Sequence, residues 1–205
     1  MTRPRWSAVG LVIGIVVMSG CGTGQPARGP SAPAGSWKVV AAADLGESQR
    51  NQKDRAVAAR EAMYTRLVSR LGQALGQGGP AAAIPVCQKE APEIAGQVAR
   101  EYQVAIGRTS FKLRNAANAP PEWAKPLVAD KPAEPVYLAG PDGWLAAFLP
   151  IRLQATCITC HGTNDTITPE TRQALARYYP QDQATGFQDG DLRGWFWVEV
   201  GPGKK

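Results

Sequence analysis

The sequence predicts an α+β fold, in which one long helix comes first and a mostly β region follows. Between Glu47 and about Gly76, apolar residues recur at helical spacing. From Tyr102 onward the chain changes to short runs rich in Val, Ile, Tyr and Trp, separated by Pro, Asp and Gly, as strands and turns require. With 205 residues, 44% hydrophobic and 20% charged, the chain has the composition of a globular protein with one domain of ordinary size.

The first twenty residues are predicted to be an export signal. Arg3 and Arg5 precede an apolar run, Ala8 to Met18, that is too short to cross a membrane. The run ends in Met18-Ser19-Gly20-Cys21, which resembles the lipobox of bacterial lipoproteins, so Cys21 is expected to be the lipidated first residue of the mature chain. An uncleaved anchor or an ordinary secretory signal is the alternative. The mature protein is expected on the periplasmic side of a bacterial membrane, held there by its lipid.

Residues 21–46 are predicted to be a flexible tether. Gly, Pro, Ala and Ser dominate between Cys21 and Ser36, a composition that buries too little apolar surface to fold. The folded domain is therefore expected over residues 47–200, with a short tail at 201–205.

The first helix is expected from Glu47 to about Gly76, where Gly78-Gly79-Pro80 ends it. Arginine and lysine residues flank its apolar stripe, as in an amphipathic helix. The stripe consists of Val57, Tyr64, Leu67, Leu71 and Leu75.

Pro80 is suited to the first turn of a second helix, which would carry Cys87. Pro85 and Pro92 divide this region into short pieces, so Cys87 is predicted to lie on a broken helix. Such a break can turn a side chain toward a cofactor, although prolines also simply end helices.

The β region contains four predicted strands and one further helix. The last strand alternates two sets of largely apolar residues, which suits an antiparallel strand with both faces partly covered. The helix has Thr168 as its cap and Pro169 at its first position. The predicted strands are Val104–Ser110, Pro135–Ala139, Trp144–Leu153 and Leu192–Val200, and the helix is Thr168–Tyr179.

The charge of the chain excludes one class of partner. The formal net charge is +6, and it falls to +4 when the signal takes Arg3 and Arg5 with it. No cluster of Lys and Arg is interleaved with aromatic residues, so a nucleic-acid partner is not expected. An acidic redox partner or an anionic membrane surface remains open.

The most specific pattern is Cys157-Ile158-Thr159-Cys160-His161, the attachment signature of a c-type haem. In such a site each thiol adds across one vinyl group of the haem to form a thioether, and the adjacent imidazole binds the iron. The sequence therefore predicts one covalent haem c, held by Cys157 and Cys160, with His161 as an axial ligand.

The second axial ligand follows from a count of residues. His161 is the only histidine of the chain, which excludes bis-histidine ligation within it. Met63 is the one methionine left after removal of the signal, and its place in the helical stripe favours core packing. Cys87 is the one cysteine with no assigned role, so it is the leading candidate for the sixth ligand. The alternatives are a lysine or tyrosine ligand, an open sixth position, or a Cys87 that is only a small buried apolar residue.

A zinc site is the rival interpretation of the same residues. Cys87, Cys157, Cys160 and His161 together supply a Cys₃His ligand set. Adjacent Cys160 and His161 are awkward to direct at one tetrahedral ion, because such sites usually offer separated pairs of ligands. This interpretation is therefore less favoured than haem.

Several stretches, in this order, resemble a known family: Ile84-Pro85-Val86-Cys87 followed by Ala91-Pro92, then GRTSFKLRNAANAPPEW, CITCHG and GFQDGDLRGWFWVEV. The family is the PAS-like mono-haem c-type domain. It occurs alone in exported proteins and as the extracytoplasmic input domain of bacterial chemoreceptors and sensor kinases. The resemblance implies a PAS-like antiparallel sheet with helices around it, one covalent haem, and axial ligation by His161 and Cys87.

Three classes of function are compatible with these expectations. A sensor of redox state or of a diatomic gas is suggested by the family and needs a separate membrane signalling partner. A membrane-tethered electron carrier needs only a redox partner. An enzyme is the least favoured class, because the chain has no second histidine for acid–base work near the iron. Arg108, Lys112 and Arg114 are candidates to pair with the haem propionates, or they are solvated surface residues.

Overall fold

The computed structural model describes residues 29–203. The predicted export signal and Cys21 lie outside the described residues. No helix among residues 29–203 has the length and apolar character needed to span a membrane.

Five strands form one antiparallel sheet in the order β1-β3-β4-β5-β2. The two central strands are β4 and β5, and their register places Phe148 opposite Trp197. Residues 38–40, within the range predicted as tether, form β1 and pair with β3 at one edge of the sheet. The bounds are β1 Lys38–Val40, β2 Val104–Thr109, β3 Val136–Ala139, β4 Leu145–Arg152 and β5 Leu192–Val200.

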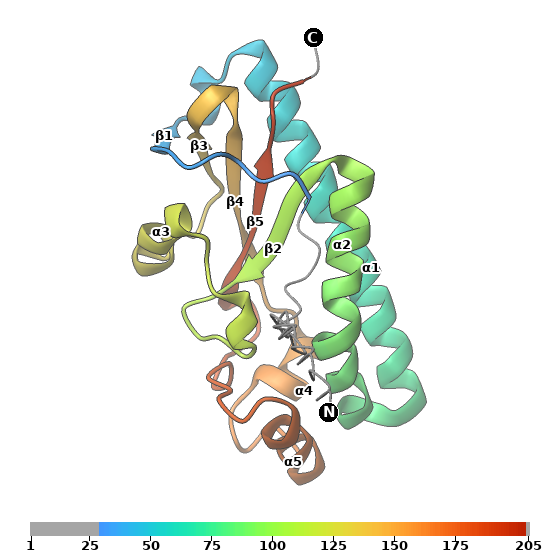
Figure 1. The fold of residues 1–205 in the computed structure, drawn as a ribbon. Helices are drawn as coiled ribbons and strands as arrows, with labels where there is room; N and C mark the ends of the chain where they lie inside the picture. Colours follow the sequence, from blue (N-terminus) through green and yellow to red (C-terminus); the bar gives the residue numbers. More distant parts are fainter. Residues whose placement is uncertain (1–28, 204–205) are drawn as a thin grey trace, which may run out of the picture.

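A helical hairpin covers one face of the sheet. Helix α1 (Glu47–Pro85) is interrupted at Gly78 and Gly79, where Gly79 has a φ of 69° that glycine adopts without strain. The chain reverses there, so that α2 (Ala91–Tyr102) returns along α1 (Figure 1). The predicted end of the first helix at Gly78-Gly79-Pro80 thus corresponds to the turn of the hairpin.

Small residues allow the hairpin to approach the sheet closely. Ala56 and Ala59 of α1 and Ala95 and Ala99 of α2 are all buried in this contact. They face the branched and aromatic side chains of the sheet in one close-packed core. The sheet contributes Val104, Ile106, Ala147, Leu149, Phe196, Val198 and Val200 to it.

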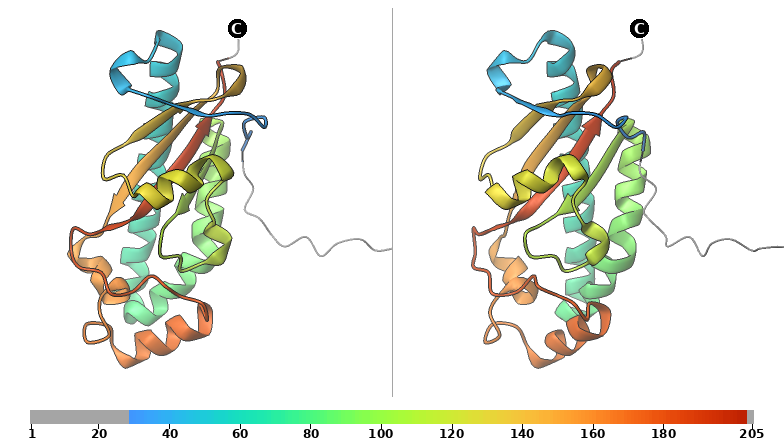
Figure 2. Two further views of the ribbon diagram at one scale, coloured as in Figure 1. Left: turned by 90° about the vertical axis from the view of Figure 1, so that its left-hand side faces the viewer. Right: turned by 60° about the vertical axis from the view of Figure 1, so that its left-hand side comes forward.

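The other face of the sheet is covered by the segment that follows β2. This segment includes α3 (Lys125–Asp130), which lies across the sheet from the helical hairpin (Figures 1 and 2). Beneath it, the Phe148 ring stacks on Trp195 with their centroids 4.9 Å apart, a contact worth about 0.5–1.5 kcal/mol beyond its buried area. Both faces of the central strands are therefore buried, as predicted for the last strand.

Two further helices lie beyond one end of the sheet (Figure 2). Helix α4 (Ile158–His161) is a single turn, and α5 (Pro169–Tyr178) begins at Thr168, whose hydroxyl accepts a hydrogen bond from the Thr171 amide. Helix α5 packs on the end of α1 through a cluster of Ile84, Ile167, Leu175 and Tyr179. The elements at this end, together with α1, surround the candidate site.

The predicted α+β architecture is confirmed, with its antiparallel sheet, long N-terminal helix and short flanking helices. The four strands predicted from β-rich runs agree with β2 to β5 to within one residue at each end. Helix α2 and strand β1 were not predicted.

Candidate functional site

The Cys157–His161 motif lies beyond one end of the sheet, where part of it is exposed to solvent. A 3-10 turn, Ala155–Cys157, leads directly into α4, so both cysteines stand on one short helical segment. Their thiols form no disulfide. The threonines of the motif region, Thr156 and Thr159, are exposed, whereas the two cysteines are half-buried.

A cavity of about 500 Å³ opens beside the motif. Cys157, Cys160 and His161 line it from one side, and Cys87 lines it from the helical hairpin. The four groups singled out from the sequence, which are spread over 75 positions of the chain, therefore face the same space.

Most of the remaining cavity wall is apolar. Helix α1 contributes one side of it, with residues at helical spacing, and the sheet contributes another. Tyr64, Leu67, Val68, Leu71 and Leu75 come from α1, and Ile151 and Phe196 come from β4 and β5. The stripe predicted for the first helix is thus largely a cavity wall.

The His161 imidazole is held in one orientation. Its Nδ1 lies 2.7 Å from the carbonyl oxygen of Ala184, and because a carbonyl can only accept, Nδ1 carries the hydrogen and donates it. The Phe187 ring stands edge-on to the imidazole at 6.3 Å. Burial, with the positive charges of Arg114 and Arg193 next in importance, holds the pKa of His161 well below its usual value. The ring is therefore neutral, with Nε2 as its lone-pair nitrogen.

Cys87 lies on an irregular turn between the two helices of the hairpin. Residues Val86–Glu90 form a π-helical turn, closed by a hydrogen bond from the Ala91 amide to the Val86 carbonyl. Pro85, which has no amide hydrogen to donate, immediately precedes this turn. Burial raises the pKa of the Cys87 thiol, and the nearby charge of Arg108 opposes the shift in part.

Residues 182–187 are hydrogen-bonded to α4 and to the residue that follows it, and we call them the clamp segment. In addition to the Ala184 contact with His161, the Phe187 amide donates to the His161 carbonyl at 3.0 Å. The Gly186 amide donates to the Gly162 carbonyl at 2.7 Å. Three hydrogen bonds thus join the clamp segment to His161 and its neighbour, which fixes the position of the imidazole.

Arg114 ties the motif and the clamp segment together. Its Nε donates to Asp182 Oδ2 at 3.0 Å, in an ion pair whose side chains are only 9% and 10% exposed. Its Nη2 donates to the carbonyls of Cys160 and Ala184, at 2.6 Å and 3.1 Å. Although Arg114 also lines the cavity, most of its guanidinium is engaged with protein atoms.

The other two candidates for propionate contacts are placed differently. Lys112 is not among the residues that line the cavity, since its Nζ donates to the Thr185 carbonyl at 3.1 Å and lies over the Phe187 ring. Arg108 lines the cavity, and its side chain has no hydrogen bond or ion pair with any residue in the described range 29–203. The structure therefore brings Arg108 and Arg114, but not Lys112, to the cavity.

Arg193 is a cavity residue that the sequence reasoning missed. It stands near the start of β5, where its Nη1 donates to Ser110 Oγ at 2.7 Å and to the Lys112 carbonyl at 3.0 Å. Burial, followed by the charges of Arg114 and Arg108, lowers the pKa of Arg193 to about 10. The available signal was a positive charge in a strand whose other residues, apart from Glu199, are apolar or glycine, but the sequence reasoning assigned Arg193 to the alternation of the strand.

The positions of the described side chains argue against the zinc site that the sequence left as an alternative. Among residues 29–203, no three His, Cys, Asp or Glu side chains are gathered in a way that could hold a metal ion. Cys87, Cys157, Cys160 and His161 instead surround a space of about 500 Å³, far larger than one ion needs. The Cys₃His cluster is therefore not formed by the described side chains.

A family model matches residues 39–201, which include the sheet, the hairpin and the motif. The chain belongs to the Tll0287-like family. The resemblance to a mono-haem c-type family, first seen in the sequence motifs, is thereby confirmed.

One solved structure of the Tll0287-like family supports the fold. It is titled as the crystal structure of the cyanobacterial haem protein Tll0287, and it aligns with 78% of this chain and 99% of its own at a TM-score of 0.54. The two sequences are 22% identical, so the likeness establishes a shared fold. No curated protein matches the chain.

Proposed function

We propose that this chain is an exported, lipid-anchored c-type haem protein that senses redox state or a diatomic gas through one covalent haem. The observation that carries the proposal is the convergence of Cys157, Cys160, His161 and Cys87 on one cavity. The Tll0287-like family supports it, since the solved member Tll0287 is titled a haem protein.

The residues present fit such a group. The cavity of about 500 Å³ lies within the range of about 300–1,000 Å³ of ordinary small-molecule sites. Its wall is mainly apolar, as the haem macrocycle requires, and its polar donors include the guanidinium groups of Arg108, Arg114 and Arg193. The two thiols are free, and the imidazole is neutral with Nδ1 already bonded to Ala184.

Each residue has a distinct role in this proposal. Cys157 and Cys160 attach the haem, each by adding its S–H across one vinyl group, so that sulfur bonds to one carbon and hydrogen to the other. His161 presents Nε2 to the iron while Ala184 holds its other nitrogen. Cys87 would supply a second ligand of the iron, and Arg108 would pair with a propionate. When bound, the haem provides a one-electron couple and an iron coordination position.

The turn that carries Cys87 favours sensing. It is the π-helical turn Val86–Glu90, which follows the reversal at Gly78 and Gly79 and joins the cavity directly to α2, which packs on the sheet. Such turns are rare and occur frequently at functional sites. A change in the position of Cys87 would therefore be passed to α2 and to any membrane partner bound near it.

The decisive test replaces Cys87 by alanine in the haem-loaded protein. The ferric Soret band should shift, and carbon monoxide should bind the ferrous form more readily than in the wild type, because a ligand of the iron is lost. Met63→Leu is the matched control, since it removes the other sulfur of the hairpin and should leave the spectrum unchanged. An unchanged ferric spectrum in Cys87→Ala would reject the His/Cys assignment.

Electron transfer is the second candidate, and one observation favours it. Gln154, Thr156 and Thr159 line the cavity and are exposed, so the attachment edge lies close to the protein surface, where a redox partner could approach. A carrier should keep the same ligands in both oxidation states and ignore carbon monoxide, whereas a sensor should change its ligation. Spectra of both oxidation states, with and without the gas, separate the two.

The lipid anchor rests on the sequence around Cys21 alone. Replacing Cys21 by serine should move the protein from the membrane fraction to the soluble periplasmic fraction. Retention in the membrane would instead favour an uncleaved anchor.

A further inference from the structure

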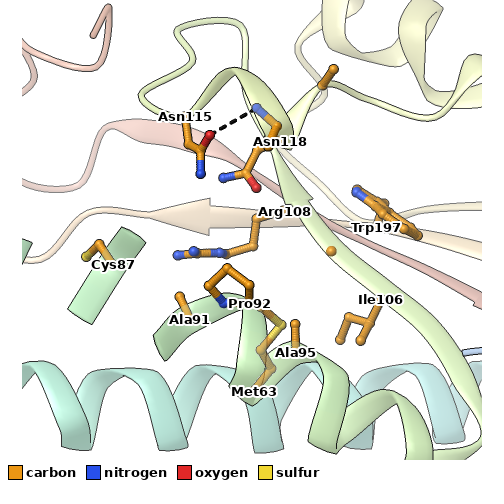
Figure 3. Close-up of a pocket in the computed structure, with 13 residues that line it drawn as sticks. Met63, Cys87, Ala91, Pro92, Ala95, Ile106, Arg108, Asn115, Asn118 and Trp197 are labelled. Atoms are coloured by element: carbon orange, nitrogen blue, oxygen red, sulfur yellow. Dashed lines mark hydrogen bonds between the residues drawn. The ribbon is translucent and has the colours of Figure 1, made fainter. Parts of the chain in front are cut away.

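A second, smaller cavity adjoins the large one. It lies between α2, β2 and the turn at residues 115–119, as Figure 3 shows. Its volume is about 40 Å³, whereas a single water requires about 10–15 Å³ measured in the same way. It therefore has room for a molecule of three or four heavy atoms. Cys87, Arg108 and Asn118 line both cavities, so they form the wall between them.

The smaller cavity has an apolar floor and a polar side. Its floor is formed mainly by Met63 and by residues of α2, and its polar side by Arg108, Asn115 and Asn118. Figure 3 shows the Arg108 side chain running between Pro92 and the two asparagines, with its guanidinium on the side of Cys87. Within residues 29–203, no aspartate or glutamate lines either cavity. The charge of this space is therefore positive.

Arg108 differs from the two arginines near it. Arg114 is paired with Asp182, and Arg193 is bonded to Ser110 and to the Lys112 carbonyl. Arg108 has no such partner in the described part of the chain. A guanidinium that is only partly exposed and unpaired is electrostatically costly, and an anion would offset that cost.

The two asparagines add neutral donors. Asn115 Oδ1 accepts a hydrogen bond from the Ala117 amide at 3.0 Å, which leaves its Nδ2 hydrogens free to donate toward the cavity (Figure 3). The Asn118 carboxamide has no hydrogen bond with any other residue from 29 to 203. One charged and two neutral donor groups thus line a space that no described aspartate or glutamate reaches.

We propose that Arg108, Asn115 and Asn118 bind a small planar monovalent anion, a carboxylate or another oxyanion of three or four heavy atoms, in the smaller cavity. The fork of a guanidinium matches such an anion with two parallel hydrogen bonds. A haem propionate uses two of the five N–H donors of Arg108, so the others remain for the anion. Because Cys87 forms part of the wall of the smaller cavity, an anion bound there stabilises Cys87 in its position as the proposed ligand of the haem iron. Only that last effect rests on the proposed function.

The test measures binding by calorimetry, with sodium formate and sodium nitrate as probes in low-chloride buffer. It uses the haem-loaded mature protein and, in parallel, a Cys157→Ser/Cys160→Ser variant that cannot attach haem. Saturable binding is expected in both. Arg108→Gln should weaken it by about tenfold or more, because a charge-assisted bidentate contact is lost. Asn118→Leu, which keeps the side-chain size, should weaken it about threefold. Arg100→Gln, an exposed arginine of α2, is the control and should change nothing.

Three results would overturn the site. Equal binding by the wild type and Arg108→Gln would show that the guanidinium does not hold the anion. Binding by the haem-free variant alone would show that a propionate occupies Arg108 fully. A loss in Arg108→Gln without any loss in Asn118→Leu would place the anion outside the smaller cavity. A protein that binds formate but carries no haem would refute the proposed function and leave this site intact.

Discussion

The two halves of α1 have the same apolar periodicity and different neighbours. In the first half, Ala56, Ala59 and Met63 are at most 2% exposed and pack directly on the sheet. In the second half, from Tyr64 to Leu75, the stripe faces a cavity of about 500 Å³, and Val68 is 43% exposed. One half of the helix completes the core with the side chains of the chain itself, whereas the other forms an apolar wall of the cavity proposed for haem.

The polar groups at the two ends differ in the same way. Beside the first half, Gln52 is 3% exposed and donates to the backbone carbonyls of Gly143 and Val200, at 2.8 Å and 3.1 Å, so it serves only the ends of the strands. Beside the second half, Arg114 holds the motif and the clamp segment, while the Arg108 side chain has no partner among residues 29–203. The Gln52 amide thus donates to the fold, although its Oε1 has no hydrogen-bond partner among the described residues, whereas the Arg108 guanidinium, which lines the cavity, makes no hydrogen bond with them.

The largest expected effect separates the two halves by removing the cofactor. Compared with the haem-loaded wild type, the Cys157→Ser/Cys160→Ser variant should have a Tm lower by about 10 °C or more, because bound haem stabilises only the folded state. Amide exchange should rise over Tyr64–Leu75 and α4, while β4 and β5 stay protected. A uniform loss of protection along the whole chain would show that the two halves of α1 do not differ in their dependence on haem.

A smaller effect is expected from shortening one side chain in each half. Met63→Ala should lower the free energy of unfolding by about 2–5 kcal/mol with or without haem, because Met63 is 2% exposed and packs within the main core cluster. Leu71→Ala should cost less than about 1.5 kcal/mol in the haem-free protein and clearly more when haem covers the cavity wall. Urea denaturation of each variant in both states measures these differences. Equal costs for Leu71→Ala in the two states would count against the cofactor as its neighbour.

The smallest effect concerns the buried ion pair at the site and one exposed ion pair of the helical hairpin. Arg114→Gln should cost about 2 kcal/mol, because it leaves Asp182 buried without its charge partner, although the amide can keep one hydrogen bond. Arg66→Gln breaks the exposed pair with Glu101, whose side chains are 38% and 49% exposed, and should cost less than about 1 kcal/mol. Chemical denaturation provides the comparison. A greater loss in Arg66→Gln would contradict the structural role assigned to Arg114.

Much of the candidate site could be predicted, because a contiguous sequence motif and a count of the cysteines, histidines and methionines indicate its residues. The spacing of Cys157, Cys160 and His161 is a contiguous signature, and Cys87 emerged as the one cysteine with no assigned role. The strands β2 to β5 were visible as β-rich runs between turn residues. Helix α2 was not, because Pro85 and Pro92 suggested interruption, whereas the chain uses Pro85 before a π-helical turn and Pro92 in the first turn of α2.

The arginines show where sequence reasoning stops. Arg108, Lys112 and Arg114 lie in one short segment and could not be told apart in the sequence. In the described structure the Arg108 side chain is unpaired, Lys112 contacts the clamp segment, and Arg114 is buried in an ion pair. Arg193 joined the cavity through Ser110, 83 positions away. Long-range pairs of this kind depend on how the sheet and the loops pack, and no local sequence pattern indicates them.

The sequence by itself determined the chemistry that this protein can offer: two thiols and an imidazole at fixed spacing, and one more cysteine with no assigned role. Only the tertiary structure decided which groups share a space, which nitrogen of His161 is free, and which arginine lacks a partner. The physical reason is that covalent spacing fixes neighbours along the chain, whereas burial, hydrogen bonding and charge pairing are settled between residues that meet only when the chain folds.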